Sequence, residues 1–191
     1  LEIDFVDTQL RRCRFCAHNY SFGTYRQKCP ERFAAELLEQ QRRHGARHFY
    51  LGDQYIDAAD LRRIAEELLR QGADLRWHVM GRPTADFDQP LLDLLAAAGC
   101  RWISWGVETG SQRLLDVARK GTAVAETREV LRRTARAGIA SLPMMLFGLP
   151  GSTDEDLVQT FELLEDVYDS ISAMTASAFV LYRDTPFGRR P

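Results

Sequence analysis

Two cysteines lie close together at Cys13 and Cys16, within the segment "RRCRFCAHN". Thiolates at this C-x2-C spacing suit an iron-sulfur cluster or zinc, while a redox dithiol and two ordinary thiols are the other interpretations. A thioredoxin-type dithiol normally belongs to a far smaller fold, and a zinc site that adds His18 would crowd its ligands in "CAH". The spacing therefore favours a metal or cluster site.

The other cysteines give weaker signals. Four cysteines in 191 residues are too few for a disulfide scaffold. Cys100 follows the apolar run "AAAG", which favours the role of a small buried apolar residue. Cys29 stands directly before Pro30, and its role is open at this stage.

Polar or glycine-rich residues recur where predicted strands end. A lone Asp or Arg there is most often a helix cap or a surface ion pair, and "GLPGSTDED" also fits a turn that caps the next helix. Glu108 differs, because it follows the apolar "WISWGV" and a carboxylate there needs a hydroxyl or cationic partner. The strand-end candidates are Asp53, Arg82, Glu108 and the turn Gly148 to Gly151.

These residues are positioned by a regular alternation of strands and helices. Strands separated by helices predict parallel pairing, with chemistry at the carboxyl ends of the strands. We therefore predict an α/β fold, a partial (β/α)6 TIM-like barrel of parallel strands with outer helices. The predicted strands are residues 1–8, 47–53, 75–82, 101–109, 139–148 and 172–182. The predicted helices are residues 30–45, 57–72, 88–99, 111–138 and 153–169.

Composition restricts the class of protein. With 45% apolar and 27% charged residues, residues 1–191 are expected to form one domain, and the absence of an initiator Met suggests that it was taken from a longer chain. The net charge of −2, without a basic stripe, does not indicate nucleic-acid binding. No signal peptide and no apolar run long enough for a membrane span are visible, so we expect a cytoplasmic protein.

The combined motifs resemble the radical S-adenosylmethionine (SAM) enzymes, and most closely the branch that often carries a cobalamin-binding domain. The matching segments are "CRFC", "FYLGDQY", "AAAGCRWISWGVETGSQRLLDVARKGT", "AGIASLPMMLFGLPGSTDED" and "YRDTPFG". They cover almost the whole chain. The ordered pair "GVETGS…KG" and "AGI…FGLPG" is far more specific than a lone glycine motif.

The resemblance implies a four-iron, four-sulfur (4Fe-4S) cluster held by three cysteines in a C-x3-C-x2-C loop, with SAM on the fourth iron. Electron transfer to SAM would give a 5′-deoxyadenosyl radical that acts on an organic substrate, by methylation or rearrangement. It also implies a small-molecule or natural-product substrate, a reductant such as a flavodoxin or ferredoxin, and cobalamin through a flanking domain.

Carried over by position, Cys13 and Cys16 match the second and third cluster ligands. The resemblance also implies SAM contacts, with Phe15 and the turn Gly148 to Gly151 near the adenine. Asp53 would accept from the methionine amino group, Glu108 from ribose or amino-acid protons, and Arg82 would meet the carboxylate. The implied SAM-binding residues are Phe15, Leu51, Gly52, Asp53, Arg82, Glu108, Gly148, Leu149, Pro150 and Gly151.

The pattern departs from the family at the first ligand, where Gln9 replaces the expected cysteine. An amide oxygen is a poor substitute for a thiolate on iron. Three explanations are open: Cys29 supplies the missing thiol, residue 9 was changed in an otherwise active enzyme, or the domain is a degenerate barrel without a competent cluster that serves as a binding or scaffold module.

Overall fold

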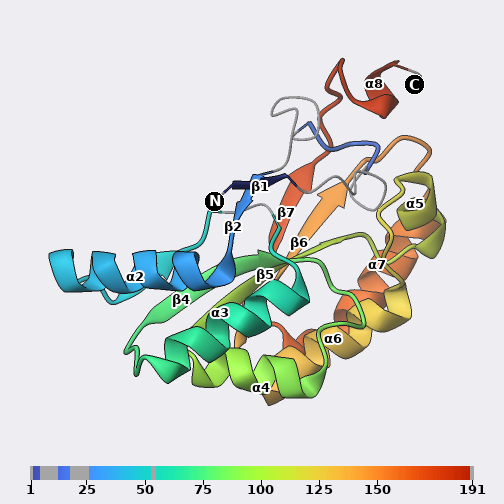
Figure 1. Ribbon diagram of the computed structural model, residues 1–191. Helices are drawn as coiled ribbons and strands as arrows, with labels where there is room; N and C mark the ends of the chain where they lie inside the picture. Colours follow the sequence, from blue (N-terminus) through green and yellow to red (C-terminus); the bar gives the residue numbers. More distant parts are fainter. Residues whose placement is uncertain (1, 5–12, 18–25, 53–54, 190–191) are drawn as a thin grey trace.

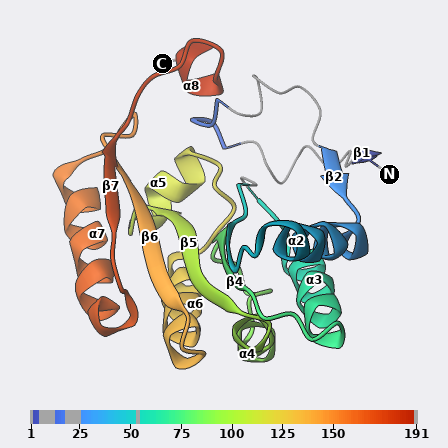
Figure 2. The same cartoon turned by 90° about the vertical axis from the view of Figure 1, so that its left-hand side faces the viewer.

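A computed structural model describes residues 2–4, 13–17, 26–52 and 55–189 of the chain. Its main feature is a curved sheet of five parallel strands in the order β3-β4-β5-β6-β7, with helices along one face (Figures 1 and 2). The strands of this sheet are β3 (His48–Tyr50), β4 (Arg76–Gly81), β5 (Cys100–Glu108), β6 (Ala140–Phe147) and β7 (Thr175–Ala178). This arrangement confirms the predicted partial barrel.

Helices connect the strands in the predicted alternation. Helix α2 begins at Pro30, whose fixed φ suits a first turn, and ends before Gly45, which has φ 65° as a left-handed C-cap. The predicted helical region 111–138 is divided into two helices. The helices are α2 (Pro30–His44), α3 (Ala58–Arg70), α4 (Gln89–Ala97), α5 (Gln112–Val117), α6 (Val124–Arg136), α7 (Asp154–Asp166) and α8 (Pro186–Arg189), with a 3-10 turn η1 (Tyr168–Ser170).

The first strand does not join the parallel sheet that the sequence predicts for it. Strand β1 (Glu2–Asp4) pairs antiparallel with β2 (Arg26–Lys28), in a separate two-stranded sheet. The rest of the predicted strand lies outside the described residues. The alternation of strands and helices therefore identified the five parallel strands but not the pairing partner of the first one.

The main apolar core lies between the sheet and its helices. Trp77 is 2% exposed, and its Nε1 donates to the Ala98 carbonyl at 2.8 Å. The turn before β5 passes so close to β4 that a Cβ on Gly99 would lie 2.0 Å from the Leu75 carbonyl oxygen, and φ 95° at this position also requires glycine. Cys100 is fully buried in this core, as its apolar context predicted.

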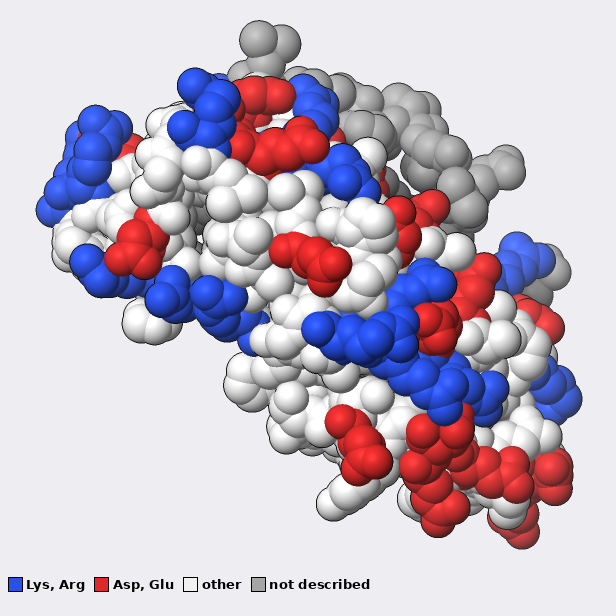
Figure 3. Space-filling model, turned by 90° about the horizontal axis from the view of Figure 1, so that it is seen from below, with Lys and Arg blue, Asp and Glu red and all other residues white. Residues whose placement is uncertain are grey.

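The outer face of the helices carries basic and acidic side chains side by side (Figure 3). Arg128 and Arg132 on α6 both bind Asp166, and Arg133 and Arg136 both bind Glu129. Such exposed pairs contribute little to stability, but they neutralise the local basic charge. Within the described residues, none of the helices has the length and apolar character needed to span a membrane.

Candidate functional site

The cysteine pair forms a short loop at the carboxyl ends of the strands. The Cys16 N–H donates to the Cys13 carbonyl at 3.2 Å, and the Arg14 N–H donates to the Ala118 carbonyl, after α5, at 2.8 Å. Cys13 is 5% exposed and Cys16 is partly buried. The loop is therefore fixed against the barrel, with both thiols sheltered.

Arg82 follows β4 and reaches this loop. Its Nη2 lies 3.3 Å from the Cys13 sulfur, and its guanidinium carbon is 5.9 Å from the centroid of the Tyr55 ring. The structure thus brings together two residues that the sequence had placed at the ends of different strands. It also places a permanent cation beside one of the two candidate metal ligands.

Glu108, at the end of β5, forms a buried ion pair. Its Oε1 accepts a hydrogen bond from Lys120 Nζ at 2.5 Å, and the two side chains are only 13% and 9% exposed. Lys120 also lies 5.7 Å from the centroid of the Phe15 ring. The cationic partner that Glu108 required is therefore Lys120, and the pair adjoins the cysteine loop.

Sequence reasoning did not identify Lys120. Its signal was present in the composition: of the 25 lysines and arginines, only Lys28 and Lys120 are lysines. The Lys120 ammonium is a compact cation that lies in a confined, buried space beside Glu108. Space for it depends on Gly106, because a Cβ there would lie 2.8 Å from Lys120 Nζ and 3.2 Å from Glu108 Oε1.

The Gly148 to Gly151 turn follows β6 at the same edge of the sheet. Gly148 and Gly151 have φ 81° and 80°, which L side chains rarely adopt. Leu149 between them is 3% exposed, and its carbonyl accepts from the Ser152 N–H at 2.9 Å. The sequence predicted both the glycine turn and the helix that starts after it.

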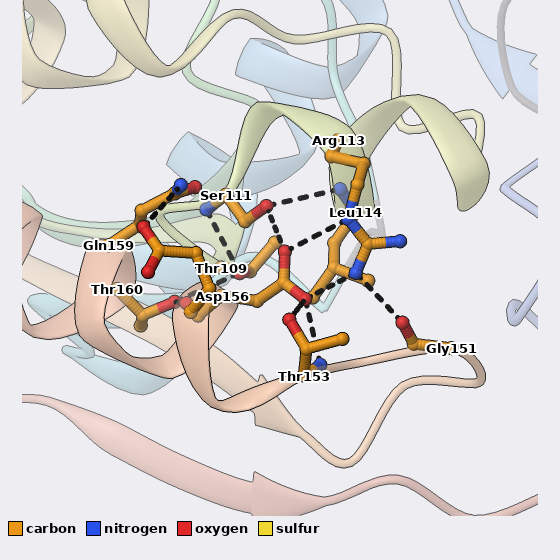
Figure 4. A network of polar contacts seen from close by, with 10 residues as sticks. Thr109, Ser111, Arg113, Leu114, Gly151, Thr153, Asp156, Gln159 and Thr160 are labelled. Carbon is orange, nitrogen blue, oxygen red and sulfur yellow. Dashed lines mark hydrogen bonds and ion pairs between the residues drawn. The ribbon is translucent and has the colours of Figure 1, made fainter.

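A polar network around Asp156 fixes this turn to α5 (Figure 4). The Asp156 carboxylate accepts from Ser111 Oγ at 2.6 Å, from the Thr153 N–H at 2.8 Å and from Thr153 Oγ1 at 2.7 Å, and it forms an ion pair with Arg113. Arg113 Nη2 also donates to the Gly151 carbonyl at 2.8 Å. Burial raises the pKa of Asp156, but the bonds from Arg113, Ser111 and Thr153 outweigh it and hold that pKa well below its usual range.

A second apolar cluster, which we call the mouth cluster, joins these parts. It is separate from the main core and collects residues from the cysteine loop, α5, the end of β6 and the C-terminal segment. It consists of Ala118, Leu149 and Phe187, with Phe15, Val117, Leu146 and Phe179 packed against them. The cysteine loop and the glycine turn are thus held against one shared apolar unit.

The remaining sequence candidates either lie outside the described residues or stand apart from the mouth cluster. Gln9, His18 and Asp53 lie outside the described residues. Leu51 is buried after β3 and Gly52 is exposed beside it, while Cys29 stands at the N-cap of α2. In the described part of the chain, no group of three or more His, Cys, Asp or Glu side chains is placed to hold a metal ion.

Comparison with known proteins gives one family. The family model described as "Radical SAM superfamily" matches residues 10–164. An anaerobic magnesium-protoporphyrin IX monomethyl ester cyclase of Cereibacter sphaeroides is 30% identical over 159 residues, which are 81% of this chain and 26% of that protein. A tryptophan 2-C-methyltransferase of Streptomyces laurentii is 25% identical over 182 residues, which are 87% of this chain and 29% of that protein.

The fold also matches a solved structure. The radical S-adenosylmethionine methyltransferase TsrM from Kitasatospora setae, solved with cobalamin and a [4Fe-4S] cluster, superposes with a TM-score of 0.81 at 24% identity. The match covers 93% of this chain and 36% of that one. The chain spans between a quarter and a third of the length of the curated relatives given above.

Proposed function

Because this chain belongs to the radical SAM superfamily, we propose that it binds a 4Fe-4S cluster and SAM at the mouth of its partial barrel and acts as a radical SAM enzyme on an organic substrate. The observation that carries the proposal is the contact between the cysteine loop and the buried ion pair, in which Lys120 lies 5.7 Å from the Phe15 ring. The cysteines that we propose as metal ligands and the charged groups that we propose as SAM contacts therefore lie close to one another.

The donor set fits the cluster at two positions. Cys13 and Cys16 supply two soft sulfur ligands in one fixed, sheltered loop, and iron-sulfur clusters are held by such thiolates. The first ligand position of the C-x3-C-x2-C pattern is Gln9. Cys29 belongs to a different element, the start of α2, so the described residues supply two ligands from the loop itself.

The charged groups fit the amino-acid part of SAM. Its carboxylate would meet Lys120 and Arg82, and its ammonium or ribose hydroxyls would donate to Glu108. The positive φ values of Gly148 and Gly151 turn the backbone sharply after β6, which leaves peptide groups for the adenine edge. Phe15, which is partly buried and packed against the mouth cluster, provides apolar surface at the same place.

A cluster held by Cys13 and Cys16 would supply the one-electron reduction of the SAM sulfonium, with cleavage of the C5′–S bond to methionine and a 5′-deoxyadenosyl radical. The residues of the chain bind SAM, orient it and exclude water, since the site is preformed by the buried pair and the mouth cluster. We propose a flavodoxin or ferredoxin as the source of the electron.

The relatives narrow the reaction class. One acts as a tryptophan 2-C-methyltransferase and another as a porphyrin monomethyl ester cyclase, according to their names. We propose a methylation or ring-forming rearrangement of a small molecule or natural product, with cobalamin supplied by a flanking domain. We further propose a cytoplasmic location, because none of the four cysteines is in a disulfide and unpaired cysteines persist in reducing compartments.

Anaerobic reconstitution with iron and sulfide tests this proposal. Iron content and electron paramagnetic resonance after reduction are measured with and without SAM, for the wild type, Gln9→Cys and Cys13→Ala. About four irons per chain and a spectrum that changes on adding SAM are expected for the wild type, and loss of this iron is expected in Cys13→Ala. No stable cluster in the wild type would overturn the proposal, and a cluster in Gln9→Cys alone would assign the defect to residue 9.

Gln9 favours one alternative, a degenerate barrel that keeps the ligand pocket as a binding or scaffold module without a competent cluster. Calorimetry with SAM and iron-free protein separates the two functions, with Glu108→Gln as the control. Binding that depends on Glu108, together with a cluster that forms only in Gln9→Cys, would identify the binding module. A cluster in the wild type would exclude it.

A further inference from the structure

We propose that Phe187, in the C-terminal segment 182–189, is a positioning residue that clamps the cysteine loop and keeps the Cys13 and Cys16 thiols away from solvent. The inference rests on the proposed function for its biological purpose, because a sheltered thiol pair serves a cluster that water would damage. The packing that carries the inference is independent of any bound cofactor.

The segment is a compact unit in its own right. The Thr185 side chain is fully buried, its Oγ1 donates to the Tyr182 carbonyl at 2.7 Å, and the Gly188 N–H donates back to that Oγ1 at 3.2 Å. A Cβ on Gly188 would lie 2.1 Å from the Tyr182 carbonyl oxygen. The unit therefore needs glycine at residue 188 to close on itself.

This unit contacts the cysteine loop directly. The Phe187 N–H donates to the Arg14 carbonyl at 3.1 Å, and the Arg14 guanidinium carbon lies 4.6 Å from the centroid of the Phe187 ring. Phe187 is 3% exposed, and its ring meets that of Phe179 edge-on at 6.0 Å. Both ribbon views draw α8 beside the short segment 13–17 (Figures 1 and 2).

The opposite side of the loop is held by α5. The Arg14 N–H donates to the Ala118 carbonyl at 2.8 Å, and Arg14 Nη1 donates to the Val117 carbonyl at 3.3 Å. Arg14 is therefore bonded to α5 through its N–H and to α8 through its carbonyl. Because Arg14 follows Cys13 and stands two residues before Cys16, holding it at both ends fixes both thiols.

The two sides of this clamp differ in how firmly they are attached. Helix α5 is joined to α7 by the Asp156 network, whereas segment 182–189 follows the last strand and reaches the mouth cluster chiefly through Phe187. Loss of the Phe187 ring would therefore release the outer side of the loop while the sheet stays intact. Solvent would then reach the thiols from that side.

Alkylation of the full, reduced, iron-free chain by iodoacetamide tests the clamp, with each cysteine followed by peptide mass spectrometry. Partly buried Cys29, outside the mouth cluster, is an internal reference, and fully buried Cys100 reports global unfolding. In Phe187→Ala we expect Cys13 and Cys16 to react about tenfold faster, with Cys29 and Cys100 unchanged.

Matched variants complete the design. Phe161→Ala removes the same side chain from the exposed surface of α7 and should leave all four rates at the wild-type values. Phe187→Leu keeps apolar volume in the cluster and should restore most of the protection. Gly188→Ala disturbs the same unit without touching Phe187, and should also accelerate Cys13 and Cys16.

Wild-type rates at Cys13 and Cys16 in both Phe187→Ala and Gly188→Ala would overturn the inference. If Phe187→Ala also exposes Cys100, Gly188→Ala becomes the deciding variant. Faster alkylation of Cys13 and Cys16 in Gly188→Ala, with Cys100 still protected, would support the clamp. Unchanged alkylation rates in Gly188→Ala would refute it. Failure of the proposed function would appear separately, as missing iron in the reconstituted wild type.

Discussion

Replacing Lys120 with methionine tests how much the buried ion pair stabilises the mouth of the barrel. At the observed 2.5 Å, the Coulomb attraction is about 7 kcal/mol for an effective dielectric constant of about 20. Desolvation of the two groups offsets much of this attraction. Removing one partner of a buried pair leaves the other charge uncompensated, at a cost of about 3–5 kcal/mol. We expect Lys120→Met to lower the free energy of unfolding by about 3 kcal/mol.

The double variant separates the pair from the packing of its side chains. In Lys120→Met with Glu108→Gln, no charge is left buried, so the free energy of unfolding should return to within about 1 kcal/mol of the wild type. Glu108→Gln alone leaves Lys120 uncompensated and should also cost about 3 kcal/mol, so the coupling energy from the double-mutant cycle should be about 5 kcal/mol.

Lys28 offers a matched control within the chain. Its Nζ lies at the same 2.5 Å from Glu36 Oε2, but the two side chains are 48% and 40% exposed. Exposed pairs contribute about 0–1 kcal/mol, so the cycle with Lys28→Met and Glu36→Gln should give a small coupling energy. Urea unfolding followed by circular dichroism measures both cycles. Equal coupling energies at the two sites would refute the argument that burial determines the strength of the Lys120 pair.

Two further substitutions and one labelling experiment have defined outcomes. Asp156→Asn should lower the free energy of unfolding by about 2 kcal/mol at pH 7, because it weakens the hydrogen bond from Ser111 and removes the ion pair with Arg113. The pKa of Asp156 in the folded chain lies below its unfolded value of about 3.9. The difference in free energy of unfolding between the wild type and Asp156→Asn should therefore be constant above about pH 5 and shrink as the pH falls below about 4. Urea unfolding at pH 7, 5 and 3 measures this difference. Gly106→Ala should displace the buried pair and weaken SAM binding by about tenfold in calorimetry, and unchanged affinity would contradict the placement of SAM beside this pair. Burial raises the pKa of Cys100 to about 12, so its thiol should resist iodoacetamide at pH 8 until urea unfolds the chain, and labelling in the native state would contradict its burial.

Local signals in the sequence were sufficient for most of the fold. Pro30 and Gly45 define the ends of α2, because proline favours the first turn of a helix and glycine favours the left-handed conformation after its last turn. The glycine turn after β6 was visible for the same reason, because Gly148 and Gly151 adopt positive φ values. The alternation of strands and helices then predicted parallel pairing, which the five-stranded sheet confirms.

Contacts between distant segments were not visible in the sequence. Lys120 reaches Glu108 only because α5 reverses the chain between them, and Phe187 meets Arg14 across almost the whole length of the chain. Neither contact leaves a periodic pattern. The same limit applies to β1, since apolar alternation identifies a strand without naming its partner, here the antiparallel β2. The roles of Gln9 and Asp53 stay predictions from the sequence.

The separation of the mouth cluster from the main core has a consequence for motion. The mouth cluster has three buried residues, whereas the main core extends under most of the sheet. A small cooperative unit opens at a lower free energy than the domain as a whole, so amide hydrogens at residues 13–17 and 182–189 will exchange before those of β5 and β6. The proposed SAM ligand would therefore enter and leave by local opening of residues 13–17 and 182–189, while the strands beneath them stay folded.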